Sequence, residues 1–76
     1  MRVLIRHVTP HPDQGWQVTD SHGQCTAMYG SQQDCLARAN VDLHRGGGGE
    51  LVIHGRDGRV QDRRTIVPEP RRGHDR

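Results

Sequence analysis

The sequence predicts an α+β domain in which a single helix covers one face of an antiparallel sheet, with the element order β-β-β-α-β-β. Three observations predict it: short stretches in which apolar and polar residues alternate, one segment with apolar residues at helical spacing, and two apolar runs joined by an Asp-Gly turn. We expect a three-stranded meander, then the helix, then a C-terminal hairpin that joins the same sheet. A chain of 76 residues has room for one domain, which we place at residues 1–67.

The first strand is expected over residues 2–9, where polarity alternates imperfectly. One side of this strand carries Val3 and Ile5, and the other carries Arg2 and Arg6. Such a division is typical of a strand that is buried on one side only, so we expect the two apolar residues to belong to the core.

Two further short strands complete the meander. Residues 10–15 end the first strand, because prolines cannot donate to a ladder and a glycine closes the turn. Residues 16–19 form the second strand, and the composition of residues 20–23 indicates a turn. Alternation over residues 25–29 predicts the third strand. Trp16 is one of only two aromatic residues, and we expect it to fill the core against the helix.

The helix is expected over residues 32–44. Ser31 can cap it by accepting a backbone N–H bond, and Asp34 lies in the first turn, where the helix dipole favours an anion. The apolar stripe is narrow and consists of Cys35, Leu36, Ala39 and Leu43. Four glycines, residues 46–49, stop the helix, and we expect them to form a flexible connector.

The last two strands, residues 50–54 and 59–67, form a hairpin whose register depends on the length of its loop. A loop of two or four residues places Leu51, Ile53 and Val60 on one face, whereas a three-residue loop sets Val60 beside Val52 and His54. We favour an even loop, because it unites the larger apolar set. The opposite face then presents the candidate partner-binding residues, which are Val52, His54, Arg59, Gln61, Arg63 and, in a short loop, Arg56.

Charge is concentrated in the C-terminal third of the chain. Residues 1–53 contain four arginines and five acidic residues, whereas residues 54–76 contain seven arginines and four acidic residues. An electrostatic partner should therefore meet the C-terminal third. Residues 68–76 lack apolar anchors, and we expect them to be a disordered basic tail.

Three segments carry a resemblance to a known family. They are His7-Val8-Thr9-Pro10-His11, Gly15-Trp16-Gln17-Val18 and, most specifically, the hairpin run from Leu51 to Val60. Over about residues 5–66 the chain resembles the small bacterial and phage proteins of domain of unknown function 2188. It departs from them at Gln32-Gln33-Asp34-Cys35, near the start of the helix. The resemblance implies a compact α+β domain, and it implies no activity, cofactor or catalytic residue.

Residue spacing argues against an enzyme and against a metal protein. Cys35 near a helix N-terminus could have a lowered pKa, with His54 or His7 as its base, but nothing in the sequence brings them together. His7 and His11 are separated by a proline that prevents helical spacing, and the two cysteines lack the close pairing of a zinc site. We therefore predict no catalytic residue, no metal ligand and no cofactor. We also expect Cys25 and Cys35 to be free thiols rather than a disulfide.

These observations lead to a functional hypothesis. Neither a signal peptide nor a membrane span is evident, so we expect a cytoplasmic protein. A chain with 30% hydrophobic residues has a thin core that a partner or a homodimer would support. We predict a non-enzymatic protein-interaction module, such as a phage or mobile-element regulator or inhibitor of a host protein or nucleoprotein, which binds an acidic surface. The alternative is a nucleic-acid-binding module that uses the arginines of the hairpin.

Overall fold

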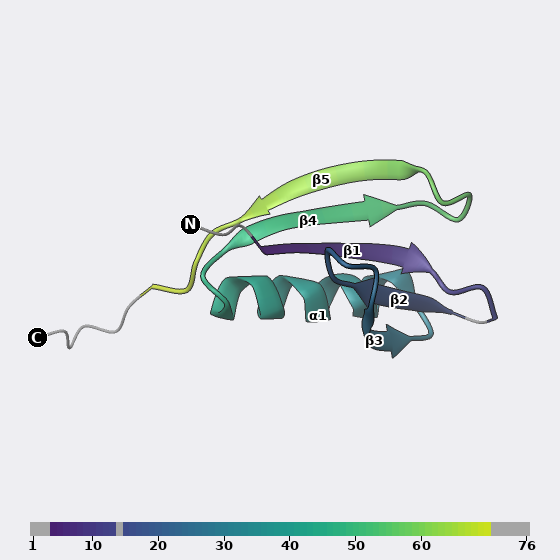
Figure 1. Cartoon of the computed structure of the whole chain (residues 1–76), viewed down its shortest axis with the longest axis horizontal. Coiled ribbons are helices and arrows are strands. Elements are labelled where there is room, and N and C mark those ends of the chain that lie inside the picture. Colours follow the sequence, from purple (N-terminus) through teal and green to yellow (C-terminus); the bar gives the residue numbers. More distant parts are fainter. Residues whose placement is uncertain (1–3, 14, 71–76) are drawn as a thin grey trace, which may run out of the picture.

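The computed structural model describes residues 4–13 and 15–70. One helix packs on a five-stranded sheet, which confirms the α+β class (Figure 1). The elements are β1 (Leu4–Pro10), β2 (Trp16–Thr19), β3 (Cys25–Tyr29), α1 (Gln32–Arg45), β4 (Gly49–His54) and β5 (Val60–Ile66). The spatial order of the strands is β3-β2-β1-β4-β5, so β1 lies at the centre and β3 and β5 form the edges.

The central strand pair is parallel, and the prediction of a wholly antiparallel sheet was wrong. Leu4 lies beside Gly49, and Val8 lies beside Ile53, in a parallel register of β1 and β4. The other three neighbouring pairs are antiparallel. The reason is the helix. Because α1 runs back along the sheet after β3, β4 starts at the same end as β1 and pairs with it in the same direction.

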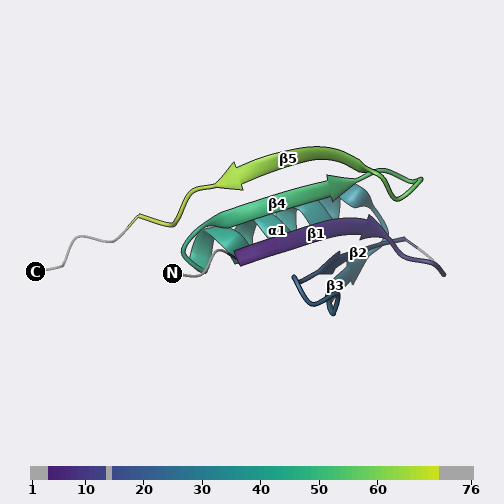
Figure 2. The same cartoon turned by 45° about the horizontal axis from the view of Figure 1, so that its top comes forward.

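The helix covers one face of the sheet and supplies three of the eight buried residues of the core cluster (Figure 2). Ser31 caps it as predicted, since its hydroxyl accepts a hydrogen bond from the Asp34 N–H at 3.2 Å. Cys35, Ala39 and Leu43 are its buried residues. They pack against side chains from the three central strands, namely Val8, Trp16, Val18, Leu51 and Ile53.

The glycines after the helix have fixed roles, so the prediction of a flexible connector was wrong. Gly46 caps α1 with its N–H bonded to the Asp42 carbonyl, and the Gly48 N–H donates to the Leu43 carbonyl at 2.7 Å. Gly47 and Gly48 have φ angles of 103° and 90°, which favour glycine. Gly49 is already the first residue of β4. The run is therefore a tight turn into the sheet.

The sides of β1 are the reverse of the expectation. Val8 is fully buried under the helix, so Arg6, two residues earlier, lies on the same side, and Ile5 lies on the other. Arg6 uses one guanidinium nitrogen to donate to the Ile5 carbonyl at 3.0 Å, whereas its Nε is buried without a hydrogen-bond partner among the described residues. Val3 and Arg2 lie outside the described residues.

The segment after β5 is attached to the end of the helix. His44 Nδ1 donates to the Val67 carbonyl at 2.8 Å, and the Glu69 N–H donates to the His44 carbonyl at 2.9 Å. This attachment brings the chain back beside the C-terminus of α1. Of the expected basic tail, residues 71–76 lie outside the described residues.

Candidate functional site

The final hairpin has a three-residue turn, and the preferred even loop was wrong. The Gly55 N–H donates to the Arg59 carbonyl at 2.9 Å, and His54 lies opposite Val60. Gly58 has a φ of 84°, the left-handed conformation that a three-residue hairpin turn requires near its end. Val60 therefore lies on the side of His54, away from the helix, and 52% of it is exposed.

A bulge in β5 restores the predicted position of Arg63. Ile53 lies opposite Asp62 whereas His54 lies opposite Val60, so Gln61 is an additional residue in β5. Beyond the bulge, Arg63 lies opposite Val52 on the side away from the helix. The three-residue turn shifts the register of β5 by one residue from the prediction, and the additional residue in the bulge shifts it back, so Arg63 lies on the predicted face.

The structure divides the six predicted partner-binding residues into two groups. Val52, His54 and Arg63 lie together on the sheet face away from α1. Arg56 and Gln61 instead line a hollow of about 450 Å³ beside Trp16 and the start of α1. Arg59 lies at the end of the turn and approaches the Asp57 carboxylate at 3.9 Å.

The sheet face away from α1, which we call the uncovered face, carries the first group. No described helix lies over it, as both views show (Figures 1 and 2). Val52 is only 3% exposed although it lies on this face, because it stands between His7 on β1 and Arg63 on β5. The face also carries other side chains at alternate strand positions, namely Ile5, Thr9, Gln17, Thr19, Met28, Glu50, Val60 and Thr65.

Two histidines meet at the centre of the uncovered face. His7 Nδ1 and His54 Nε2 are 3.0 Å apart, and the two ring centres are 5.2 Å apart. His54 Nδ1 lies 2.9 Å from the Gly58 carbonyl, which can only accept, so this nitrogen carries a proton. In neutral His54 the Nε2 atom is therefore the acceptor, and His7 donates to it from Nδ1.

The surroundings favour the neutral form of His7. Partial burial lowers the pKa of His7 below its ordinary value of 6.5, and the charges of His54 and Arg63 lower it further. Sequence reasoning missed this pair because it compared His7 with His11, its neighbour in the chain. The signal was available only in the parallel pairing of β1 with β4.

The arginines of the hairpin are mostly paired with carboxylates. Arg63 lies 3.5 Å from Glu50, Arg64 lies 3.5 Å from Asp62, and Arg59 lies 3.9 Å from Asp57. Arg56 instead lies over Trp16, with 5.9 Å between Cζ and the ring centre. In the described hairpin, three of the four arginines thus have a carboxylate within 4.0 Å, which offsets part of their charge.

The cysteines do not provide a reactive centre. Cys35 is fully buried, and burial raises the pKa of its thiol, whereas a position near a helix N-terminus suggested a lowered value. Cys25 is exposed, and both thiols are free as predicted. Among residues 4–13 and 15–70, no group of three or more His, Cys, Asp or Glu side chains is placed to hold a metal ion.

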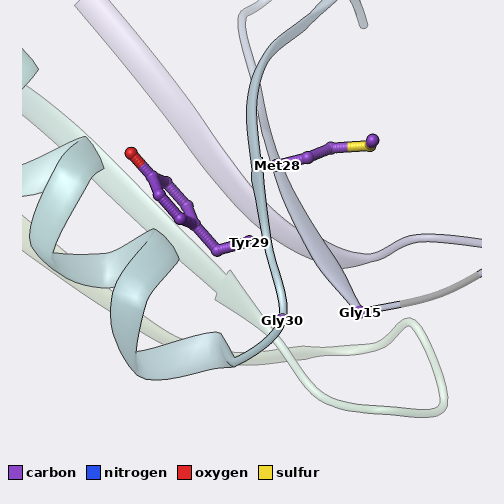
Figure 3. A pocket seen from close by; sticks show the side chains of 4 residues that line it. All are labelled: Gly15, Met28, Tyr29 and Gly30. Atoms are coloured by element: carbon purple, nitrogen blue, oxygen red, sulfur yellow. The ribbon is translucent and has the colours of Figure 1, made fainter.

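A second hollow lies beside the start of β2 and the end of β3 (Figure 3). It has a volume of about 380 Å³ and is lined by Gly15, Met28, Tyr29 and Gly30. Met28 and Tyr29 point to opposite sides of β3, and the Tyr29 hydroxyl accepts a hydrogen bond from Arg38 at 3.2 Å. The lining offers neither a nucleophile nor a base, so the hollow has no catalytic set.

The described part of the chain is thus a small two-layer α+β protein, with one helix, one uncovered sheet face and a histidine pair at the centre of that face. Residues 6–66 match a family described as uncharacterized protein conserved in bacteria (DUF2188), and the chain belongs to this family. No curated protein and no solved structure shows a significant match to the chain. In the described part of the chain, no helix has the length and apolar character needed to cross a membrane.

Proposed function

We propose that this protein is a non-catalytic interaction module that binds a protein partner through the uncovered face. One observation carries the proposal: within residues 4–13 and 15–70, a five-stranded sheet has a helix on only one of its faces. A sheet face that remains uncovered in a small domain is available to a partner. The exposed apolar residues Met28 and Val60 lie on this face, at its two edges.

The partner we propose is a protein surface with an apolar centre and acidic groups around it. The apolar part would meet Val60 and Ile5, and the acidic part would meet Arg63 and the edge of His54. Binding of this kind needs no cofactor and acts by occupying the partner's surface, so we propose a regulator or inhibitor of a cytoplasmic host protein or nucleoprotein. A phage or mobile element as its source is a further part of this proposal, and defence or phage genes beside the coding gene would support it.

Two valines allow a matched test. Val60 on the uncovered face is 52% exposed, and Val41 on the outer side of α1 is 43% exposed. Wild-type protein and the variants Val60→Asp and Val41→Asp would be immobilised in equal amounts and incubated with a bacterial lysate. The lysate proteins that each one retains would then be compared by mass spectrometry. We expect wild type and Val41→Asp to retain the same protein, and Val60→Asp to lose it. Equal retention by all three, or no retention by any, would overturn the proposal.

A second copy of the chain is one outcome of the same test. Light scattering on the purified variants measures self-association directly. A dimer that is present for wild type and Val41→Asp and absent for Val60→Asp would identify the partner as another copy. Far-UV circular dichroism checks that each variant retains its fold.

Nucleic-acid binding is the alternative, and Arg56 is the observation that favours it, because this guanidinium pairs with an aromatic ring and leaves its charge without a carboxylate partner in the described chain. Carboxylates beside the other three hairpin arginines weigh against it. Binding to duplex DNA would have to weaken with salt, with a log-log slope of about −0.9 for each phosphate contacted. DNA binding that does not change with salt would exclude this alternative.

A further inference from the structure

The separation of the two facing histidine nitrogens is the separation of two ligands on one metal ion. Zinc bonds to imidazole nitrogen at about 2.0–2.1 Å, so two such nitrogens at an angle of roughly 90–109° about the ion are about 2.9–3.4 Å apart. His7 Nδ1 and His54 Nε2 are 3.0 Å apart. We propose that these two nitrogens bind a divalent transition-metal ion on the uncovered face, a role that is separate from the binding of a protein partner.

The hydrogen bond of His54 to the turn prepares this residue as a ligand. A metal-binding histidine commonly donates its second ring N–H to a backbone carbonyl or a carboxylate, which fixes the tautomer and the ring orientation. His54 Nδ1 makes this bond with the Gly58 carbonyl at 2.9 Å. The three-residue turn holds the Gly58 acceptor in place. The Nε2 lone pair points along the line to His7, so both rings must turn until the two lone pairs converge on an ion beside that line.

His7 can become the second ligand without losing a proton. In the metal-free protein its Nδ1–H donates to His54, so the ion must replace that proton. A shift of the proton from Nδ1 to Nε2 of the same ring frees the Nδ1 lone pair, and both rings remain neutral. Because no proton leaves the protein, binding should depend little on pH above 7.

The electrostatic surroundings admit a cation at this position. Partial burial, His54 and Arg63 keep the pKa of His7 below 6.5, so the ring is neutral and able to ligate at pH 7. Arg63 repels a cation, but Glu50 lies 3.5 Å from its guanidinium and offsets the charge. Val52, which is 3% exposed, lies between His7 and Arg63 and forms an apolar floor beside the histidine pair.

The ligand set selects the class of ion. Imidazole suits Zn²⁺, Cu²⁺ and Ni²⁺, whereas Mg²⁺ and Ca²⁺ require oxygen ligands. The described residues provide no group of three ligands, so water completes the coordination, or a side chain of a bound partner does. A site with two protein ligands is open, and we expect moderate affinity and ready exchange.

The test uses the untagged full chain, since an affinity tag would bind the same ions. Isothermal titration with Zn²⁺ measures affinity for wild type, His7→Gln, His54→Gln and the control His22→Gln, whose histidine lies in the exposed turn between β2 and β3. We expect each of the first two variants to bind at least about tenfold more weakly and the control to bind like wild type. The Cu²⁺ electron paramagnetic resonance spectrum should show coupling to two imidazole nitrogens in wild type and to one in either variant.

One further variant should change the affinity in the opposite direction, which loss of the fold cannot mimic. Arg63→Gln removes the nearby cation and frees the Glu50 carboxylate, so Zn²⁺ binding should become several-fold tighter. The proposal is overturned if His7→Gln and His54→Gln bind Zn²⁺ like wild type, if His22→Gln loses binding equally, or if Arg63→Gln leaves the affinity unchanged. Purified protein without a partner is sufficient, so this result is independent of the outcome for the proposed docking function.

Discussion

Arg56 lies over the indole ring of Trp16, with 5.9 Å between Cζ and the ring centre. The contact joins the turn of the last hairpin to β2, although β1 lies between β2 and the hairpin in the sheet. Trp16 is itself a core residue, as the sequence predicted, so the guanidinium covers the outer side of the ring. The most polar segment of the hairpin is thus attached to the hydrophobic core.

Replacement of Arg56 should therefore change the surroundings of Trp16, the only tryptophan in the sequence. We expect Arg56→Ala to destabilise the fold by about 0.5–1 kcal/mol, the usual size of a cation–π contact at an exposed site. The fluorescence maximum of Trp16 should also shift to longer wavelength, because water then reaches the ring. Urea unfolding followed by circular dichroism measures the first effect, and the emission spectrum measures the second.

Arg59→Ala is the matched control for this contact. Its side chain is almost fully exposed and approaches only Asp57, so neither stability nor emission should change beyond experimental error. If Arg59→Ala shifts the emission as much as Arg56→Ala does, the position of Arg56 over the ring is wrong.

Local patterns in the sequence predicted the elements well. All five strands and the helix lie within about one to two residues of their expected positions, apart from ends that fall outside the described residues, because each depends on alternation, capping and turn residues that are adjacent in the chain. Ser31 is the clearest case, since a serine before a helical stripe acts through its own backbone neighbours.

Relations between distant segments were not predictable in the same way. The parallel pairing of β1 with β4 depends on the path of α1, which no local pattern records. The sides of β1 were reversed because this central strand is partly buried on both faces, so Ile5 and Arg6 give no reliable alternation. The histidine pair follows from that topology, and for this reason the sequence did not reveal it.

The length of the hairpin loop can be tested by measuring the stability of variants, because it decides whether Val60 belongs to the core. Ile53 is 4% exposed and belongs to the core, so Ile53→Ala should cost about 2–5 kcal/mol by leaving a cavity. Val60 was expected beside it, but the three-residue turn places Val60 on the uncovered face. Val60→Ala should therefore change stability by no more than about 0.5 kcal/mol.

Chemical denaturation of the two single variants distinguishes the loops. An even loop would bury Val60, and Val60→Ala would then cost more than a surface substitution does. A large loss of stability in Val60→Ala together with a small one in Ile53→Ala would contradict the observed register.

The glycine turn after the helix predicts that alanine destabilises the protein to different extents at two adjacent positions. Gly47 and Gly48 both have positive φ, so alanine at either position carries the backbone strain of about 1–2 kcal/mol. At Gly47 a new Cβ would meet nothing within 4 Å, whereas at Gly48 it would lie 2.9 Å from the Ile66 carbonyl oxygen and 3.0 Å from Pro68. Gly48→Ala should therefore cost about 1–3 kcal/mol more than Gly47→Ala.

Thermal and urea unfolding of the two variants measure this difference. Because the backbone strain is common to both, their difference isolates the contact of the turn with the end of β5. Equal stability of the two variants would show that Gly48 does not pack against Ile66 and Pro68, and that the glycine run is a flexible connector.

The lowered pKa of His7 predicts that stability decreases in mild acid. Folded His7 has a pKa below 6.5 because of burial and the charges of His54 and Arg63, whereas in the unfolded chain its pKa returns to about 6.5. Between these two values the unfolded state binds more protons than the folded state, so protonation favours unfolding. The contribution of His7 is complete above pH 6.5 and is lost as the pH falls towards the lowered pKa.

The comparison of wild type with His7→Gln isolates this contribution. The charged groups that lower the pKa of His7 are His54 and Arg63, and both remain in the variant, as does Glu50, the partner of Arg63. Urea midpoints measured from pH 8 to pH 5 in the presence of a metal chelator should fall more steeply for wild type than for His7→Gln. Parallel curves would mean that His7 titrates alike in the folded and unfolded states. A steeper fall in the variant would mean that the folded protein favours protonated His7, which would contradict the lowered pKa of this residue.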